Sequence, residues 1–409
     1  MTHRPTPLDA PFFTKGTVAL SVLAAAGMAV MGVRLLFGLG AVTNLSNAYP
    51  WGVWIGVDVA GGVALAAGGF TTAALAHVMH KERYEALVRP ALLTAMLGYT
   101  FVAFGVAMDI GRWYNIWHPL VMWNGRSALF EVGICVTIYL NVLYVEFLPV
   151  VAERFIGRVS LPGPLARWDA LVDRLLRALD RGLSATMFSF ILLGIVLSTL
   201  HQSSLGTLMV IAGPKMHPLW QTPILPLLFL LSAVSVGFPM VIVESLAASR
   251  SFGLKPEMNL LGELGRMTVP LLGVTLAFRL GDMFVRESFV YLREPSVPAV
   301  LFCCELLFGL VVPMRMLASR AVRESPPLLF TAAGLVVGGV LLNRIDNFIV
   351  AYTPAVAAPR YVPSPWEVLA TLGCAATLIL LYRAAVLVFP VVSRPAPGQG
   401  ARTKYAVRV

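Results

Sequence analysis

The stretch WGVWIGVDVAGGVALAAGGFTTAALAHVM occupies residues 51–79 and contains a single carboxylate, Asp58. An apolar run of this length is typical of a helix that crosses about 30 Å of hydrocarbon. Similar runs recur along the chain. The predicted spans cover residues 17–39, 51–79, 88–111, 127–153, 183–200, 223–247, 267–289, 297–314, 326–343 and 366–390. The sequence therefore predicts an all-α polytopic membrane protein with about ten transmembrane helices.

The composition supports a membrane protein. A mean hydropathy of +0.79, with 58% hydrophobic and 13% charged residues, excludes a soluble globular chain of this size. A net charge of +10 would suggest nucleic acid as a partner of a soluble protein. Here the charge comes mostly from loops on one side of the membrane, so no nucleic-acid partner is expected. The first apolar run is too long for a signal peptide and is expected to remain as the first helix.

The positive residues predict the orientation. Most Lys and Arg residues lie near both ends of the chain and in the even-numbered loops between spans. Because positive loops mark the cytoplasmic face, both termini are expected to be cytoplasmic.

Four segments are expected. Residues 1–155 form a first bundle of four helices, and residues 183–393 form a second group of six. Between them, residues 156–182 have leucines and Trp168 at helical spacing with arginines opposite, which favours an amphipathic helix on the cytoplasmic leaflet. The basic, Pro/Gly-rich stretch 394–409 is expected to be disordered.

Polar residues inside spans are costly and commonly mark functional sites. One group is expected toward the outer face, with Tyr99 nearer mid-membrane and His201 at the outer end of the fifth span. Its members are Asp58, Tyr99, Asp109, Arg112, Glu131 and His201. We interpret this group as the lining of a redox or substrate pocket. Alternatively, Asp109 and Arg112 merely pair and cap their helix, because they lie three residues apart.

A second group of ionisable residues is expected at central and cytoplasmic depths. It consists of Glu146, Glu244, Arg279, Asp282 and Glu305. Such residues can form a proton path from the cytoplasm, with bound water bridging the gaps. Arg279 and Asp282 can equally be a structural ion pair inside the membrane.

Two segments predicted on the outer side are rich in aromatic residues, histidine and amides. They are RWYNIWHPLVMWN (112–124) and the region from HQSSLG to HPLWQ (201–221). Interfacial aromatic residues are expected in any membrane belt. An outer surface with few positive charges and many aromatics also suits docking of another protein, which we favour.

The chain offers poor ligands for a metal centre. Cys135, Cys303, Cys304 and Cys374 all lie in apolar spans and form no CxxC pair, which argues against an iron–sulfur cluster or zinc site in this chain. No two histidines are expected on different helices at matching mid-membrane depth, so a bis-histidine haem is disfavoured. Ligation of a haem near the outer face by His201 and a loop histidine remains open.

Several strings together resemble the NrfD/polysulfide reductase membrane-subunit superfamily. They are NAYPWGVWIGVDVAGGVALAAGGF (47–70), the run from VRPALL through GY and DIGR to Asn115 (88–115), ALFE (128–131), EFLPVVAER (146–154), LSTLHQSSLGTLM (197–209), HPLWQ (217–221) and PSPWEVL (363–369). Within the superfamily, the chain is most similar to HybB-type integral membrane subunits of hydrogenase-2-like [NiFe] hydrogenases. The resemblance covers nearly the whole chain.

The resemblance implies a haem-free, quinone-reactive subunit in the bacterial inner membrane. Such a subunit exchanges electrons between menaquinone and a periplasmic ferredoxin-like iron–sulfur subunit, behind which lies a catalytic subunit such as a [NiFe] hydrogenase. Reduction of a quinone requires proton donors close to its oxygens. We expect His201, Tyr99, Glu131 and Asp109 to fill this role. Arg112 is expected to stabilise negative charge on a quinone oxygen or to keep Asp109 ionised.

Two other functions fit parts of the pattern. A secondary transporter also has many spans and buried charges, but it predicts a midplane substrate site and recognisable inverted repeats. An inert membrane anchor for an outer enzyme would leave the polar residues without a chemical role.

Overall fold

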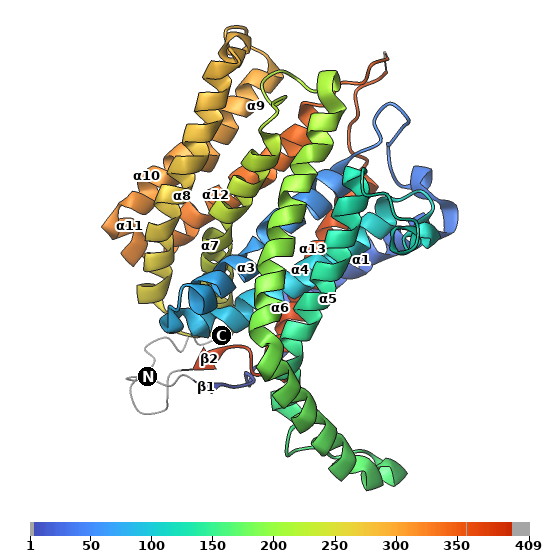
Figure 1. The fold of residues 1–409 in the computed structure, drawn as a ribbon, viewed down its shortest axis with the longest axis vertical. Helices are drawn as coiled ribbons and strands as arrows, with labels where there is room; N and C mark the ends of the chain where they lie inside the picture. Colours follow the sequence, from blue (N-terminus) through green and yellow to red (C-terminus); the bar gives the residue numbers. More distant parts are fainter. Residues whose placement is uncertain (1–3, 357, 395–409) are drawn as a thin grey trace.

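The computed structural model describes residues 4–356 and 358–394, and this part of the chain is almost wholly helical (Figure 1). Ten helices within it are long and apolar enough to cross a membrane, which confirms the predicted number of spans. Arg394 aside, the predicted basic tail lies outside the described residues.

Several of the ten spans are built from consecutive helical pieces. In chain order they are α1 (Lys15–Phe37); η2 (Trp54–Gly61), α2 (Gly62–Leu65), α3 (Ala67–Ala73) and η3 (Ala74–Val78); α4 (Glu85–Asp109); α5 (Ala128–Phe155); η7 (Gly163–Trp168), α6 (Asp169–Ala212) and η8 (Gly213–Lys215); α7 (Leu225–Phe252); α8 (Met258–Val285); α9 (Val297–Leu306), η10 (Leu307–Val311) and α10 (Val312–Ala318); α12 (Pro326–Ile345) and η11 (Asp346–Val350); and α13 (Pro365–Val388).

Short elements complete the fold. They are β1 (Arg4–Pro5), η1 (Leu39–Ala41), η4 (Glu82–Tyr84), η5 (Trp113–Asn115), η6 (His118–Leu120), η9 (Ser288–Leu292), α11 (Arg320–Glu324) and β2 (Ser393–Arg394). The two strands pair antiparallel, so the two described ends of the chain lie together at one end of the helices.

Local sequence explains where the first and last spans begin. Thr14 caps α1 in a reciprocal capping box with Thr17, and Ser364 caps α13 in the same way with Glu367. Pro365 occupies the first turn of α13, where its fixed φ suits a helix start.

Packing groups the spans differently from the expected division after residue 155. The second to fifth spans form one bundle, in which α6 packs along α5 and beside α3. The tenth span, α13, returns to pack along α1. A second bundle contains α7, α8, α9–α10 and α12, and it meets the first through contacts between α3 and α7 (Figure 1).

The close packing of α1 on α13 depends on glycine at the crossing. A Cβ atom added to Gly27 would lie 2.6 Å from Cα of Gly373, a distance that real Cβ atoms do not adopt. Small residues at such crossings let two membrane helices approach until their backbones touch.

The fifth span is longer than predicted. The helix α6 contains 44 residues and continues through position 182, where we had expected a separate surface helix to end. Figure 1 shows its first part projecting beyond the other helices, together with the end of α5.

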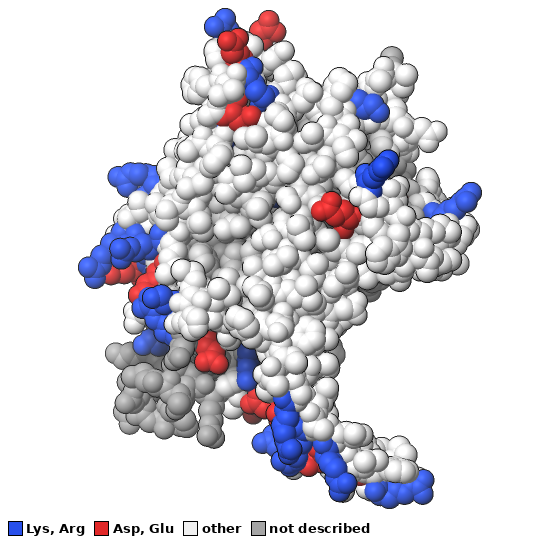
Figure 2. All heavy atoms as spheres, viewed as in Figure 1, with Lys and Arg blue, Asp and Glu red and all other residues white. Residues whose placement is uncertain are grey.

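The charge distribution fits a bilayer. Figure 2 shows a broad region of this face with little charge, interrupted by one acidic patch. Lys and Arg gather at the end that carries α11 and along the projecting part of α6, and a few more lie at the opposite end. The expectation that this end faces the cytoplasm stays a prediction from the positive-inside rule.

Candidate functional site

A fully buried polar contact in the first bundle joins Tyr99 on α4 to His201 on α6. Both side chains are 0% exposed, and the Tyr99 hydroxyl is hydrogen-bonded to Nε2 of His201. The other ring nitrogen, Nδ1, lies 2.6 Å from the carbonyl oxygen of Leu197, which can only accept. Nδ1 therefore carries the hydrogen, and Nε2 accepts the hydrogen bond that Tyr99 donates.

Other polar side chains surround this pair. The ring of Tyr139 on α5 meets that of Tyr99 edge-on, with 4.6 Å between centroids. Nε2 of Gln202 donates to the carbonyl oxygen of Val63 at 2.7 Å, which orients the amide. Oε1 of Gln202 and Oγ of Ser198 are buried and have no hydrogen-bond partner among the described residues. The site therefore offers an unused acceptor and an unused hydroxyl beside the Tyr99–His201 pair.

Glu131 lies in the first turn of α5, on the side of this pair that is predicted to face outward. The hydroxyl of Ser204, three residues beyond His201, donates to Oε1 of Glu131 at 2.7 Å. Glu131 itself is exposed on the surface of the bundle. It can therefore connect the outer part of α6 with the surroundings.

A second polar group lies where α4 and η2 meet α1 and α13. Asp58 on η2 accepts a hydrogen bond of 2.8 Å from the Thr371 hydroxyl on α13. Arg34 on α1 donates to the carbonyl oxygens of Met108, at 2.5 Å, and Ile110. Asp109 lies close enough to Arg34 and Asp58 for their charges to interact, and its Oδ1 atom has no partner within the described residues.

Glu367, in the first turn of α13, belongs to the same group. It accepts hydrogen bonds from the backbone N–H of Asn44 at 3.1 Å and from the Tyr361 hydroxyl at 2.5 Å. Burial and this contact with Glu367 raise the pKa of Tyr361 well above its ordinary value. The Trp54 indole also donates to the Glu367 carbonyl oxygen at 3.2 Å. Glu367 thus joins the first outer loop to the tenth span.

The outer residues predicted from sequence therefore form two groups and one outlier. Tyr99, His201 and Glu131 belong to the first group, and Asp58 and Asp109 belong to the second. Arg112 lies exposed in the loop after α4 and forms no ion pair with Asp109, so the alternative in which these two residues pair is not observed. The cation near Asp109 is instead Arg34, to which we had assigned no role.

The depth predicted for His201 is also wrong. We expected it at the outer end of the fifth span, but α6 continues to Ala212. The polar string after His201 resembles a loop in hydropathy, yet Gln202 and Ser204 are buried against neighbouring helices. Tyr99 and His201 consequently lie inside the bundle at the same level.

The residues of the expected proton path lie in three places. Glu146 on α5 lines a cavity of about 370 Å³ between the third, fourth and fifth spans and α3. Glu244 on α7 is buried near Thr94 on α4 and Tyr382 on α13. Arg279 and Glu305 form a buried ion pair, with 3.1 Å between Nη2 and Oε1, in the second bundle.

Asp282 pairs with Arg286 instead of Arg279. Its Oδ2 atom lies 2.7 Å from Nη2 of Arg286, and its Oδ1 atom accepts from the Thr222 hydroxyl at 2.6 Å. Arg286 also donates to the carbonyl oxygens of Pro218, at 2.8 Å, and Gln221. These contacts bind the segment 216–222 to the C-terminal end of α8.

That segment is not the docking surface we expected. Leu219 and Trp220 are at most 1% exposed, and Nε1 of Trp220 donates to Oε2 of Glu305 at 3.0 Å. The string HQSSLG lies within α6. The loop 112–124 does fit a docking surface, because Trp117 and Trp123 are 50% and 76% exposed.

Two histidines already have contacts within the protein. Both ring nitrogens of His201 are already hydrogen-bonded inside the protein. His217 contacts Trp220 and Tyr291, and burial lowers its pKa. Within residues 4–356 and 358–394, no three His, Cys, Asp or Glu side chains are placed to hold a metal ion.

These features define a class, the all-helical multi-pass membrane protein with buried polar sites in two adjoining bundles. The chain belongs to the family described as "Polysulphide reductase, NrfD", which matches residues 41–355. This finding confirms the resemblance seen in the sequence.

Several proteins are similar over most of their length. The probable Ni/Fe-hydrogenase 2 b-type cytochrome subunit of Escherichia coli K12 is 33% identical over 396 residues, 96% of each chain. The integral membrane subunit of menaquinone reductase from Nitratidesulfovibrio vulgaris is 26% identical over 353 residues, 81% of this chain and 78% of that one. A selenate reductase subunit of Mesobacillus selenatarsenatis is 23% identical over 416 residues, 92% and 93% of the two chains.

The sequence analysis missed Ser198, Gln202, Tyr139, Arg34 and Glu367. Two signals were available. Ser198 and Gln202 flank His201 within the string LSTLHQSSLGTLM, and the order Ser-Pro-Trp-Glu in residues 364–367 is a capping-box pattern. No pattern in a single chain connects Arg34 with Asp109, because they lie on different helices.

Proposed function

We propose that this chain is the quinone-reactive membrane subunit of a respiratory oxidoreductase complex. It exchanges electrons between menaquinone and an iron–sulfur subunit on the outer face, behind which lies a catalytic subunit, in our proposal a [NiFe] hydrogenase. The similarity to a hydrogenase 2 subunit and to a menaquinone reductase subunit supports this function. The exposed aromatic loop 112–124 supplies a surface for the outer partner.

The observation that carries the proposal is the buried Tyr99–His201 pair with its two unused neighbours. A quinone carbonyl needs a hydrogen-bond donor, and the Ser198 hydroxyl is free to donate. A quinol hydroxyl needs an acceptor, and Oε1 of Gln202 is free to accept. The Ser198 hydroxyl and the Gln202 amide oxygen can therefore serve both the quinone and the quinol form of a ring held beside Tyr99.

The quinone supplies the redox chemistry, and the protein orients it and moves protons. Tyr99 holds a hydroxyl proton directed at Nε2 of His201. During quinol oxidation the Tyr99 oxygen can accept a proton from a quinol hydroxyl while its own proton passes to Nε2 of His201, because the Leu197 carbonyl accepts a hydrogen bond from Nδ1 of the resulting imidazolium. Glu131, bonded to Ser204, serves as the exchange group on the outer side.

The inner cavity suits proton supply. Tyr139 and Glu146 both line it, and His77 and Arg89 line it as well. Its volume of about 370 Å³ holds many water molecules. Because the Tyr139 ring also contacts Tyr99 and His201, the cavity ends beside the proposed quinone site. Glu146 is the carboxyl group on this route.

The second outer group has a supporting role in this proposal. Asp109 lies near Arg34 and Glu367, and Asp58 lies near Asp109. They hold the first and tenth spans against α4 and provide further carboxyl groups for exchange with the outer side. Arg112, which is exposed, is assigned to the partner surface and not to the quinone pocket.

The proposal is tested in membranes that contain the intact complex. Tyr99→Phe removes one hydroxyl, and quinone-linked electron transfer should fall by about 10²–10⁴-fold, the usual contribution of a positioned acid or base. Transfer from the catalytic subunit to an artificial dye should remain. Tyr144→Phe is the matched control, because Tyr144 is exposed and bonds only Thr100. Wild-type quinone activity in Tyr99→Phe would reject this site.

A further inference from the structure

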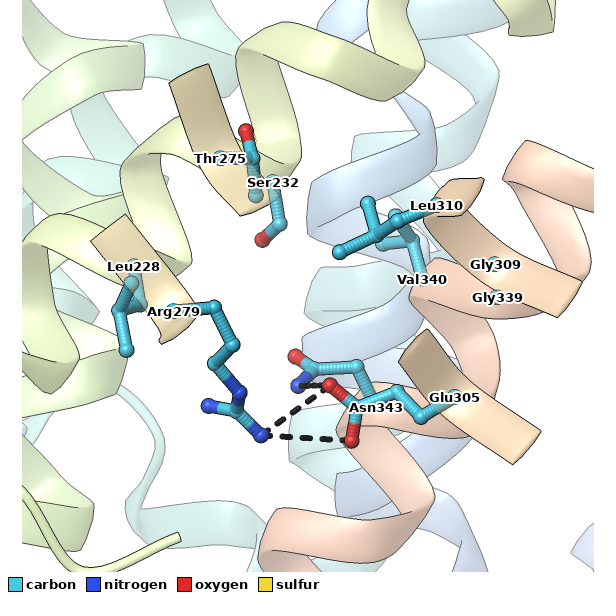
Figure 3. A pocket seen from close by; sticks show the side chains of 10 residues that line it. All are labelled: Leu228, Ser232, Thr275, Arg279, Glu305, Gly309, Leu310, Gly339, Val340 and Asn343. Atoms are coloured by element: carbon cyan, nitrogen blue, oxygen red, sulfur yellow. Dashed lines mark hydrogen bonds and ion pairs between the residues drawn. The ribbon is translucent and has the colours of Figure 1, made fainter. Parts of the chain in front are cut away.

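The second bundle contains a buried polar cluster that the proposed quinone chemistry does not use. At its centre, the Glu305 carboxylate on α9 accepts three kinds of donor. Nη2 of Arg279 lies 3.1 Å from Oε1, Nδ2 of Asn343 lies 2.8 Å from Oε1, and the Trp220 indole lies 3.0 Å from Oε2. Figure 3 shows Arg279 and Asn343 converging on Glu305. The charge of Glu305 is therefore well compensated.

The neighbouring cation, Arg344, is occupied elsewhere. Its Nη2 atom donates to the carbonyl oxygen of Phe229 at 3.2 Å and to Oγ of Ser232 at 2.9 Å. Its Nη1 atom donates to Oδ1 of Asn343 at 2.5 Å, and its guanidinium lies 3.8 Å from the Phe229 ring centroid. These contacts hold the Arg344 guanidinium against α7, while its Nε atom has no partner among the described residues and its charge still acts on Glu305.

Asp346 differs from Glu305 because its carboxyl group has no hydrogen-bond donors among the described residues. It begins η11, is 0% exposed, and lies beside Glu305. Neither of its carboxylate oxygens has a hydrogen-bond partner among the described residues. A buried carboxylate without donors is strongly disfavoured, whereas the neutral acid has a hydroxyl to donate. The Glu305 carboxylate lies within hydrogen-bonding reach and can accept from that hydroxyl.

Space for water adjoins the pair. Arg279, Glu305 and Asn343 line a cavity of about 30 Å³, together with Ser232 and Thr275 (Figure 3). A water molecule needs about 10–15 Å³ of such volume, so the cavity holds about two. Nε of Arg279 is buried without a partner in the described part of the chain and is available to one of these waters.

The remaining surroundings leave few competing charges. The titratable groups that face the pair are Arg279 from α8, Arg344 from α12 and, through Trp220, the segment that carries His217. Asp282, one turn beyond Arg279, is already paired with Arg286. On the side toward η2, Gly56 lies against the apolar residues Phe348 and Ile349.

We propose that Glu305 and Asp346 form a carboxyl pair that binds a single proton, and that this pair is a proton-binding site of the second bundle separate from the quinone pocket. The proton resides on Asp346 and is shared with Glu305. When it leaves, it passes through the internal water toward the outer segment 216–222, which Trp220 joins to Glu305. Arg279 then balances the additional negative charge.

Infrared titration of the purified full-length protein in lipid tests the proposal without turnover, so its result does not depend on quinone exchange. A protonated carboxylic acid has a C=O band that a carboxylate lacks. Asp346→Asn should remove one such band. Glu305→Gln should shift the same band, because the acceptor of its hydrogen bond has changed.

Two controls keep the assignment specific. Glu244→Gln removes a buried carboxyl on α7 that lies near Thr94 on α4 and Tyr382 on α13, and it should leave the Asp346 band in place. Thr275→Val alters the cavity lining without removing a titratable group, and it should preserve the band while slowing its exchange in heavy water. If Asp346→Asn is poorly folded, the shift of the C=O band in Glu305→Gln tests the proposal by itself. Carboxylic-acid bands identical to wild type in either folded variant of the pair would overturn the proposal.

Discussion

The Tyr99 hydroxyl donates a hydrogen bond to Nε2 of His201 across the interface of α4 and α6, and neither side chain is exposed to solvent. The direction of this bond is fixed by the Leu197 carbonyl on the far side of the imidazole ring. A tyrosine held in this way keeps its proton ready for transfer while the histidine stays neutral. Changes to the groups around this pair should therefore alter proton exchange with the quinone.

Glu131→Gln should lower quinone-linked electron transfer in the intact complex and leave dye-linked transfer unchanged. The amide keeps a hydrogen-bonding group near Ser204 but cannot take up or release a proton. Glu294→Gln, an exposed substitution in the outer loop before α9, is the control. Equal quinone-linked rates in the two variants would remove Glu131 from the site.

Glu146→Gln should weaken proton uptake from the side where the inner cavity opens. In sealed liposomes with a potential-sensitive dye, we expect a smaller potential for each electron transferred to quinone. Glu244→Gln and Asp282→Asn extend the test to the other inner carboxyls. An unchanged potential response in all three variants would mean that protons exchange on the outer side alone.

Gly27→Ala should destabilise the protein by about 1–3 kcal/mol, the usual cost of overpacking. The new methyl group would meet the backbone of Gly373, at 2.6 Å from its Cα, and neither helix can yield without losing contacts. Gly32→Ala on the same helix is the control, because nothing lies within 4 Å of its added Cβ. Thermal unfolding in detergent should separate the two variants, and equal midpoints would contradict the close crossing.

The raised pKa of Tyr84 should make the folded protein less stable at high pH. Burial and the hydrogen bond of 2.6 Å to Glu263 raise its pKa from 10.0 to about 12. Because the folded protein holds this proton more tightly than the unfolded chain, the contribution is complete below pH 10 and is lost as the pH rises toward 12. Tyr84→Phe should flatten the fall in stability over this range, and Tyr114→Phe, an exposed residue, should not. If the free energy of unfolding falls with pH equally in Tyr84→Phe and in the wild type, this prediction is contradicted.

Purified protein should lack haem b. Ligation of a haem iron by His201 would require breaking its hydrogen bonds to Tyr99 and Leu197. Optical spectra of the dithionite-reduced protein measure this directly. A Soret band at stoichiometric intensity that disappears in His201→Gln would reassign His201 as an axial ligand.

The sequence predicted the spans well, because the hydrophobic requirement of a bilayer is strong and local. It placed their ends poorly where polar residues continue inside a helix. The fifth predicted span ended at residue 200, just before His201, and the ninth at 343, before Asp346. In both places the helix continues, since packing against other helices buries the polar side chains.

The candidate site was predictable only in part. Ionisable residues such as Asp58, Glu131 and His201 stand out because charge is costly in a membrane. Ser198 and Gln202 carry no charge and were overlooked, although they provide the unused polar atoms of the site. Partners on distant segments, such as Arg34 near Asp109, depend on tertiary packing that one sequence does not reveal.

The continuity of α6 has a mechanical consequence. At about 1.5 Å per residue its 44 residues form a rod of about 66 Å, more than twice the hydrocarbon thickness. The projecting end and His201 belong to one continuous helix. Any protein or lipid that tilts the exposed arm shifts the imidazole relative to Tyr99, so a force applied outside the bilayer is transmitted to a hydrogen bond within it.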